Sequence, residues 1–137
     1  MTRRILLCDD EVHILRAAEF KFKHAGFEVR TAADGQEGWE LIQEQKPDIL
    51  ITDYQMPRLD GFGLVQRVRQ CEDTTDLPII MLTAKGLEIS HEELSRQWNV
   101  AAVIGKPFSP RELLKRVEQI LAESTPHTKQ EEELVEG

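Results

Sequence analysis

Short apolar runs alternate along this chain with longer stretches in which apolar residues recur every three or four positions. The runs have the length and composition of buried strands, and the intervening stretches have the spacing of amphipathic helices. The predicted strands are Ile5 to Cys8, Glu28 to Thr31, Ile49 to Thr52, Pro78 to Leu82 and Ala102 to Ile104. The two clearest helical stripes are Ile14, Ala18, Phe22 and Ala25 in the first stretch, and Leu113, Val117, Ile120 and Leu121 in the last.

The regular alternation of strand and helix predicts the fold class. A helix that connects two strands returns the chain to the same end of the sheet, so that consecutive strands run parallel. Five such repeats predict a single α/β domain, with a parallel sheet between helices on both faces. The segment from Lys85 to Asn99 is the weakest predicted helix, because Leu87, Leu94 and Trp98 form only a thin apolar stripe.

Local signals fix two helix ends. Gly26 follows the first helical stretch, where a glycine commonly ends a helix. Ser109 and Glu112 form a capping box with Pro110 at the first helical position. The start of the last helix is therefore predicted at Pro110.

Composition and charge narrow the class of protein. The chain has 137 residues, 40% of them hydrophobic and 31% charged, as expected of one globular domain. No apolar run approaches the roughly 20 residues that span a bilayer, and the first residues lack the apolar core of a signal peptide, so we expect a cytoplasmic protein. The net charge of -8 argues against direct binding to nucleic acid. The chain has only two cysteines, Cys8 and Cys71, too few for a fold stabilised by disulfides, and we expect both to be reduced.

Polar residues stand at the ends of four predicted strands. Asp9 and Asp10 follow the first, Asp53 comes directly after the third, Thr83 ends the fourth and Lys106 lies just beyond the fifth. In a parallel sheet, the carboxyl ends of the strands share one edge. The sequence therefore predicts that these five side chains converge in one crevice.

The converging groups suggest phosphoryl chemistry. Crowded carboxylates repel one another unless a cation lies among them, and a few oxygen ligands with open positions suit Mg²⁺. Asp53 could then act as a nucleophile toward phosphorus, because the ion would neutralise the charge of the incoming group. Lys106 and Thr83 could hold two of the phosphoryl oxygens.

Four segments resemble the receiver domain of two-component response regulators. Together they extend the resemblance over about residues 3–122. The segments are IleLeuLeuCysAspAspGlu at 5–11, ThrAspTyrGlnMetProArgLeuAspGly at 52–61, MetLeuThrAla at 81–84 and GlyLysProPhe at 105–108. The resemblance implies a flavodoxin-like, doubly wound sheet of five parallel strands in the order 2-1-3-4-5, with the site at the switch point between the first and third strands.

The resemblance also implies roles for the acidic residues. Asp53 would carry the phosphoryl group as a 4-aspartylphosphate. Asp10 would bind Mg²⁺ directly and Asp9 would do so through water or hydrogen bonds. Asp53 and the backbone carbonyl of Gln55 would complete the protein ligands.

The remaining site residues would interact with the phosphoryl group. Lys106 would pair with it, and Thr83 would move toward it. The Lys106–Pro107 peptide bond is expected to be cis, as it is in this family. The output surface would comprise the fourth helix, the fifth strand and the last helix.

Several positions differ from the usual pattern of the family. Val103 stands where many members carry an aromatic residue whose rotation accompanies activation. Gln55 and Lys85 occupy variable positions that influence the lifetime of the phosphoryl group, so we expect an altered lifetime of unspecified direction. Asn99 replaces the usual glycine before the fifth strand, a change that we expect the fold to tolerate because asparagine also adopts the left-handed conformation.

The resemblance predicts a stand-alone response regulator comprising a receiver domain at residues 1–123 and an acidic, flexible tail at 124–137. A histidine kinase or a histidine phosphotransfer protein would donate the phosphoryl group, and an unknown protein target would respond. The domain would catalyse only its own phosphorylation and dephosphorylation. A phosphorylation-independent pseudo-receiver scaffold and a phosphorelay intermediate are the alternatives.

Two rivals from other classes fit less well. A phosphohydrolase of the haloacid dehalogenase type needs a second acid two residues after its nucleophile, and Gln55 occupies that position. A flavodoxin-type cofactor carrier is disfavoured because three acids at the switch point would repel a flavin phosphate.

Overall fold

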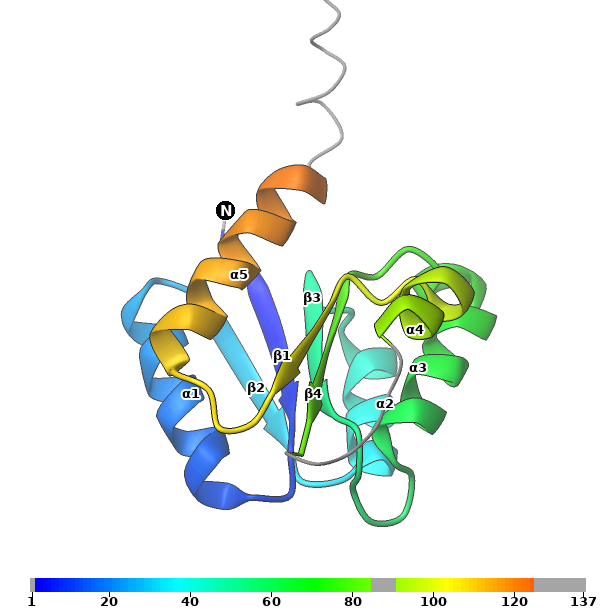
Figure 1. The fold of residues 1–137 in the computed structure, drawn as a ribbon, viewed down its shortest axis with the longest axis horizontal. Helices are drawn as coiled ribbons and strands as arrows, with labels where there is room; N and C mark the ends of the chain where they lie inside the picture. The colour runs from blue at the N-terminus through cyan, green and yellow to red at the C-terminus, as the bar shows by residue number, and fades with distance from the viewer. Residues whose placement is uncertain (1, 85–90, 125–137) are drawn as a thin grey trace, which may run out of the picture.

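The computed structural model describes residues 2–84 and 91–124. Within these ranges it contains one parallel sheet of five strands in the order β2-β1-β3-β4-β5, with helices on both faces (Figure 1). The strands are β1 (Arg4–Cys8), β2 (Glu28–Ala32), β3 (Ile49–Asp53), β4 (Ile79–Thr83) and β5 (Ala102–Gly105). The helices are α1 (Val12–His24), α2 (Gly35–Glu44), α3 (Gly61–Gln70), the short 3-10 helix η1 (Glu72–Thr74), α4 (His91–Trp98) and α5 (Pro110–Ser124).

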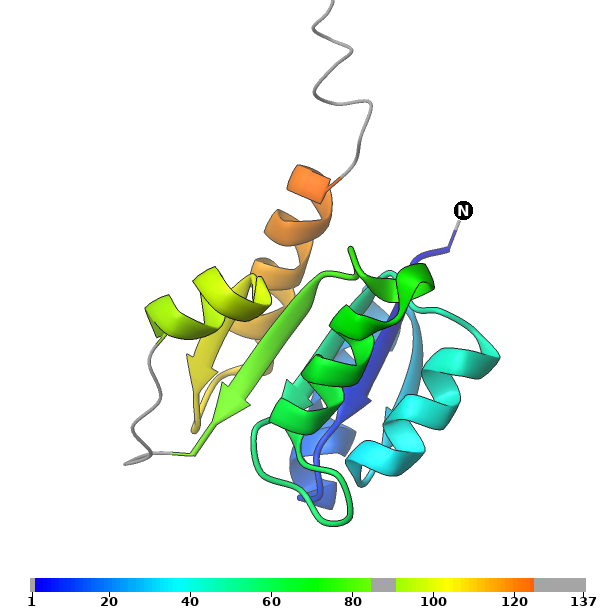
Figure 2. The same ribbon diagram turned by 90° about the vertical axis from the view of Figure 1, so that its right-hand side faces the viewer.

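The predicted fold class and strand order are confirmed. Every predicted strand is present, with ends that differ by at most one residue from those expected. The strand arrows point toward the same edge of the sheet (Figure 2). The order reverses at β1, which pairs with β2 on one side and β3 on the other, so β1 and β3 flank the switch point.

The core consists of two apolar layers, one on each face of the sheet. Helices α1 and α5 cover one face, and α2, α3 and α4 cover the other (Figure 1). All five residues of β3 and all five of β4 are buried. Strands covered on both faces have no solvent side, which explains why these segments read as continuous apolar runs rather than alternating patterns.

One predicted helical stripe is partly wrong. Ala18 and Phe22 of α1 are buried as predicted, but Ile14 is only half-buried and Ala25 is an exposed residue at the C-terminal cap. Leu15 takes the buried position instead. The stripe of α5 is confirmed, since its four predicted residues are all buried.

The helix ends follow the local signals. Gly26 has a φ of 99°, a conformation that residues with a side chain rarely adopt, and α1 ends just before it. The Glu112 N–H donates to Ser109 Oγ at 3.2 Å, which caps the start of α5. Asn99 has a left-handed backbone, with a φ of 54°. The Lys106–Pro107 bond is cis, as the resemblance implied.

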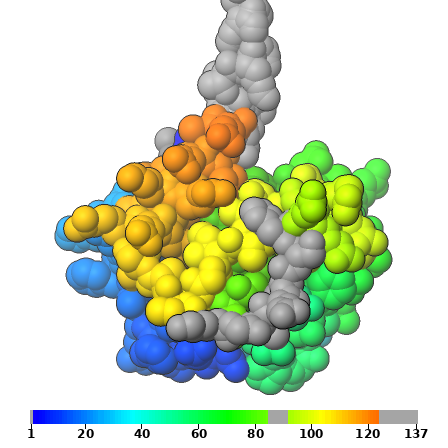
Figure 3. All heavy atoms as spheres, in the orientation of Figure 1, coloured from blue at the N-terminus to red at the C-terminus, as the bar shows by residue number. Residues whose placement is uncertain are grey.

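Part of the predicted fourth helix lies within the described residues. Helix α4 begins at His91, with Leu94 buried and Trp98 half-buried. Lys85 and Leu87 lie outside the described residues, as does the predicted tail beyond Ser124, where α5 ends. In the space-filling view, α5 and the segment around β5 form adjoining parts of one surface (Figure 3).

Two further expectations concern the cysteines and the membrane. Cys8 and Cys71 are both free thiols, as predicted, and Cys8 is buried. None of the described helices is long and apolar enough to cross a membrane.

Candidate functional site

Three carboxylates meet at the switch point of the sheet. Asp9 and Asp10 follow β1, and Asp53 ends β3, the strand paired with β1. One oxygen from each of the three carboxylates lies within 4.8 Å of the other two. Asp9 and Asp53 are buried, whereas Asp10 is exposed. The sequence-predicted acidic cluster is therefore assembled in the structure.

Backbone hydrogen bonds orient the two buried carboxylates. The Asp9 N–H donates to the carbonyl of Ala32 at 3.0 Å, and Asp9 Oδ1 accepts from the Glu11 N–H at 2.9 Å. Asp53 Oδ1 accepts from the Tyr54 N–H at 3.0 Å. These bonds restrict the rotation of both side chains before any ligand arrives.

The loop after β3 packs tightly against the site. The Gly61 N–H donates to the carbonyl of Tyr54 at 2.8 Å. A Cβ at Gly61 would lie 1.9 Å from the carbonyl oxygen of Asp53, a distance that no side chain can tolerate. Only glycine can therefore begin α3 so close to the end of β3.

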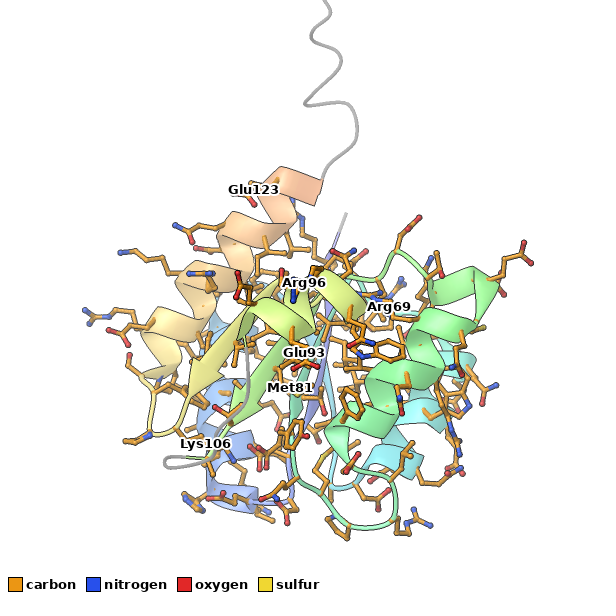
Figure 4. The ribbon with its side chains drawn as sticks, turned by 45° about the vertical axis from the view of Figure 1, so that its right-hand side comes forward. Arg69, Met81, Glu93, Arg96, Lys106 and Glu123 are labelled. Atoms are coloured by element: carbon orange, nitrogen blue, oxygen red, sulfur yellow. The ribbon has the colours of Figure 1, made fainter. Side chains whose placement is uncertain are left out.

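Lys106, which directly follows β5, reaches the same cluster. Its N–H donates to the carbonyl of Thr83 at 2.7 Å, which ties the end of β5 to the end of β4. Its Nζ lies 2.9 Å from Asp9 Oδ2 and 3.3 Å from Asp53 Oδ2. The side chain is only 10% exposed. In Figure 4, Lys106 lies far from Glu123, which is near the C-terminal end of α5.

The crowding changes the proton affinity of these groups. Burial raises the pKa of the Asp53 carboxyl to about 6, and the neighbouring Asp9 carboxylate adds to the rise while Lys106 opposes it. Burial alone would lower the pKa of Lys106, but its contacts with the carboxylates of Asp9 and Glu11 raise it overall. Lys106 is therefore a fixed positive charge at neutral pH.

A hollow of about 230 Å³ opens beside Asp53. It could hold a phosphoryl group, and Gln55 and Ala84 contribute to its wall. Asp10, Glu11 and Lys106 also line it. Thr83 is buried at the end of β4, next in sequence to Ala84, and does not itself line the hollow.

The donor set fits a small divalent cation. Asp9 Oδ2 is buried and accepts no hydrogen bond, although the Lys106 ammonium lies 2.9 Å away. A buried carboxylate oxygen without a hydrogen bond is costly, and a cation would satisfy it. Oxygen donors alone favour Mg²⁺ or Ca²⁺, and three carboxylates around an open hollow fit the partly hydrated Mg²⁺ better.

Sequence reasoning missed one residue of the site. Glu11 Oε2 accepts a hydrogen bond from Lys106 Nζ at 3.0 Å. Its position directly after Asp10 was the only signal in the sequence, and a third acid beside a strand end is more often an exposed residue at a helix start.

A second unpredicted contact braces the loop that carries the site. Arg58 adopts a left-handed backbone with a φ of 67°, and its Nε lies 3.1 Å from Asp34 Oδ2 at the start of α2. Asp34 also caps α2 by accepting from the Glu37 N–H at 2.8 Å. One carboxylate therefore connects the loop after β3 to the neighbouring helix.

A parallel sheet in the order 2-1-3-4-5, with carboxylates and a lysine at its switch point, defines a receiver-type signalling domain. The family model described as "Response regulator receiver domain" matches residues 5–118. The chain therefore belongs to the response regulator receiver domain family.

Named relatives and solved structures agree with this assignment. The chain is 39% identical over 119 residues to a probable transcriptional regulator, ycf27, of Cyanophora paradoxa, covering 87% of this chain and 48% of that protein. It is 36% identical over 124 residues to the alkaline phosphatase synthesis transcriptional regulatory protein PhoP of Bacillus subtilis, covering 90% of this chain and 50% of that protein. The chain thus spans about half the length of these curated relatives.

Its structure also resembles that of the chemotaxis response regulator CheY4 of Vibrio cholerae. The TM-score is 0.79 at 30% identity, with 88% of this chain and 99% of that chain covered.

Proposed function

We propose that this chain is a Mg²⁺-dependent phospho-acceptor in which Asp53 receives a phosphoryl group from a histidine kinase or a histidine phosphotransfer protein. The observation that carries the proposal is the convergence of Asp9, Asp10 and Asp53 with Lys106, whose Nζ lies 3.3 Å from Asp53 Oδ2. The two residues are far apart in sequence and meet only because β3 and β5 both flank β4.

The transfer would proceed by attack of an Asp53 carboxylate oxygen on phosphorus. The new bond joins that oxygen to phosphorus, and the bond between phosphorus and the donor's imidazole nitrogen breaks. The electron pair of the broken bond returns to the imidazole, so the products are an aspartyl phosphate and a free histidine side chain.

The surrounding residues would position and stabilise the transferred group. Asp9, Asp10, Asp53 and the Gln55 carbonyl would hold Mg²⁺, which offsets the negative charge of the phosphoryl oxygens. Lys106 would donate to one phosphoryl oxygen and Thr83 to another. This electrostatic stabilisation is the main contribution that phosphoryl transfer requires of a protein.

Phosphorylation would act as a signal by shifting a conformational equilibrium. New charge at Asp53 favours the state in which Thr83 and Lys106 approach the phosphoryl group, and a partner protein binds that state with a different affinity. Thr83 pairs with Gly105 of β5, and Lys106 directly follows that strand, so the surface formed by α4, β5 and α5 would carry the readout.

Acetyl phosphate with Mg²⁺ tests the proposal directly. We expect intact-protein mass spectrometry to show one labile phosphoryl adduct, which is absent when EDTA replaces Mg²⁺. The matched control is Asp53→Asn, which keeps the shape of the side chain and loses the nucleophile. An unmodified wild-type protein at saturating donor and Mg²⁺ would favour the phosphorylation-independent scaffold instead.

A further inference from the structure

Glu11 is the N-terminal cap residue of α1, yet its side chain makes no capping hydrogen bond. Serine, threonine, aspartate and asparagine are the usual residues at this position, because their short side chains reach the free N–H groups of the first turn. The Glu11 carboxylate points instead toward the switch point, where Oε2 accepts from Lys106 Nζ at 3.0 Å. The contact joins residues that are 95 positions apart in sequence.

The Lys106 ammonium faces three carboxylates in this arrangement. Its Nζ lies 2.9 Å from Asp9 Oδ2, 3.0 Å from Glu11 Oε2 and 3.3 Å from Asp53 Oδ2. The contact with Glu11 is a hydrogen bond, and those with Asp9 and Asp53 are ion pairs. A phosphoryl group on Asp53 would attract this ammonium toward its own oxygens, and one of the three contacts would then weaken.

Exposure identifies which contact is weakened. The side chains of Asp9 and Asp53 are 2% and 8% exposed, whereas that of Glu11 is 46% exposed. Separating a buried carboxylate from its cation leaves an uncompensated charge, which is strongly unfavourable. A half-exposed carboxylate is rehydrated by solvent, so its ion pair breaks at little cost.

We infer that Glu11 is a positioning residue that holds the Lys106 ammonium in the unphosphorylated protein and releases it to the phosphoryl group. This role rests on the proposed function. The Glu11 N–H also orients Asp9 through the 2.9 Å bond to Oδ1, so the backbone of Glu11 supports the acidic cluster while its carboxylate competes for Lys106. Because the carboxylate stabilises only the unphosphorylated state, it opposes phosphorylation.

Glu11→Gln tests this role, because it removes the charge and keeps the length of the side chain and its backbone N–H. We expect the rate constant for phosphorylation by acetyl phosphate to rise about threefold, the upper part of the range for one exposed ion pair. The rate of phosphoryl loss should stay near the wild-type value, since Lys106 has already left Glu11 in the phosphorylated protein. A purely structural role of Glu11 would not raise the phosphorylation rate while leaving the rate of phosphoryl loss unchanged.

The matched control is Glu19→Gln on the same helix. Glu19 pairs with Lys23 at 2.9 Å, so this variant makes the same change in net charge away from Lys106. Its phosphorylation rate should equal that of the wild type. If Glu19→Gln accelerates phosphorylation as much as Glu11→Gln, overall charge explains the effect and the inference is wrong.

A second measurement does not depend on turnover. Nuclear magnetic resonance of the Lys106 side chain in the metal-free, unphosphorylated protein should show a shifted Nζ signal in Glu11→Gln and an unchanged one in Glu19→Gln. Should Glu11→Gln fold poorly, the Glu11 carboxyl carbon of the wild type can be followed instead, and we expect it to shift when Asp53 is phosphorylated.

The outcomes separate the two proposals. Absence of phosphorylation in the wild type and in Glu19→Gln contradicts the proposed function. If the wild type is phosphorylated normally, two results contradict the inference alone. One is a phosphorylation rate in Glu11→Gln that is equal to or slower than that of the wild type, and the other is a Lys106 signal that is the same in the wild type and in Glu11→Gln.

Discussion

Replacing Asp53 with asparagine should stabilise the metal-free protein at neutral and alkaline pH. The folded structure resists ionisation of this carboxyl, because burial and Asp9 raise its pKa from 3.8 to about 6. The unfolded chain ionises the same group near the ordinary value. Above pH 6 the difference amounts to about 3 kcal/mol of lost stability, which Asp53→Asn removes.

The expected gain is smaller than that limit. Asparagine can keep the hydrogen bond from the Tyr54 N–H through its own carbonyl oxygen, but its amide NH₂ would then face the Lys106 ammonium, whose Nζ lies 3.3 Å from Asp53 Oδ2. We expect Asp53→Asn to raise the free energy of unfolding by about 1 to 3 kcal/mol at pH 8.

The sign of the pH dependence follows from the raised pKa. Below about pH 4 the carboxyl is protonated in both the folded and the unfolded state, so the variant has no advantage. Between pH 4 and pH 6 the unfolded chain ionises first, and wild-type stability falls relative to Asp53→Asn. Above about pH 7 the carboxyl is ionised in both states and the difference is constant.

Urea unfolding in EDTA, followed by circular dichroism at pH 4.5 and pH 8, measures this difference. The free energies of unfolding of the wild type and Asp53→Asn should differ more at pH 8 than at pH 4.5. Mg²⁺ at saturating concentration should then stabilise the wild type more than Asp53→Asn, because the variant lacks one proposed ligand. A variant that is less stable at pH 8 in EDTA, or an advantage that does not shrink in acid, would refute the argument from burial and like-charge repulsion.

Three further predictions concern stability and can be measured by urea unfolding. Arg69→Ala should lower the free energy of unfolding by about 2 to 3 kcal/mol, because the guanidinium donates to three backbone carbonyls around η1 and the turn after α4. The control is Arg67→Ala, which should have little effect because Arg67 is exposed. Gly35→Ala should cost about 3 kcal/mol or more, because its Cβ would lie 1.9 Å from a backbone oxygen, and Gly105→Ala, with nothing within 4 Å, is the control. Asn99→Ala should lower the free energy of unfolding by about 1 kcal/mol, because the backbone of Asn99 is left-handed, whereas Asn99→Gly should be nearly neutral. Equal effects of the two substitutions would contradict this explanation.

The strands and the position of the site could be predicted from the sequence because both depend on local patterns. A strand buried on both faces has a continuous apolar run in its sequence, so the sequence alone predicts β3 and β4. Parallel strands place their carboxyl ends on one edge, so any polar residue that directly follows such a run must lie there. The convergence of Asp9, Asp53 and Lys106 was therefore predictable from their positions along the chain.

Helical phase was less predictable. A shift of one residue at the start of a helix rotates every later side chain by about 100°. Leu15, rather than Ile14, faces the sheet because α1 begins at Val12, and that start depends on how the preceding loop leaves β1.

Long-range contacts between flexible side chains were decided only by the tertiary structure. The position of Glu11 directly after Asp10 places it near the site, but it does not show that the Glu11 carboxylate binds Lys106, 95 positions away. Nothing near Arg69 in the sequence indicates that it binds the turn after α4. Local sequence determines which conformation a segment favours and which face it buries, since both depend on neighbours in the chain. The partner of a long charged side chain depends instead on which elements the folded sheet brings within its reach.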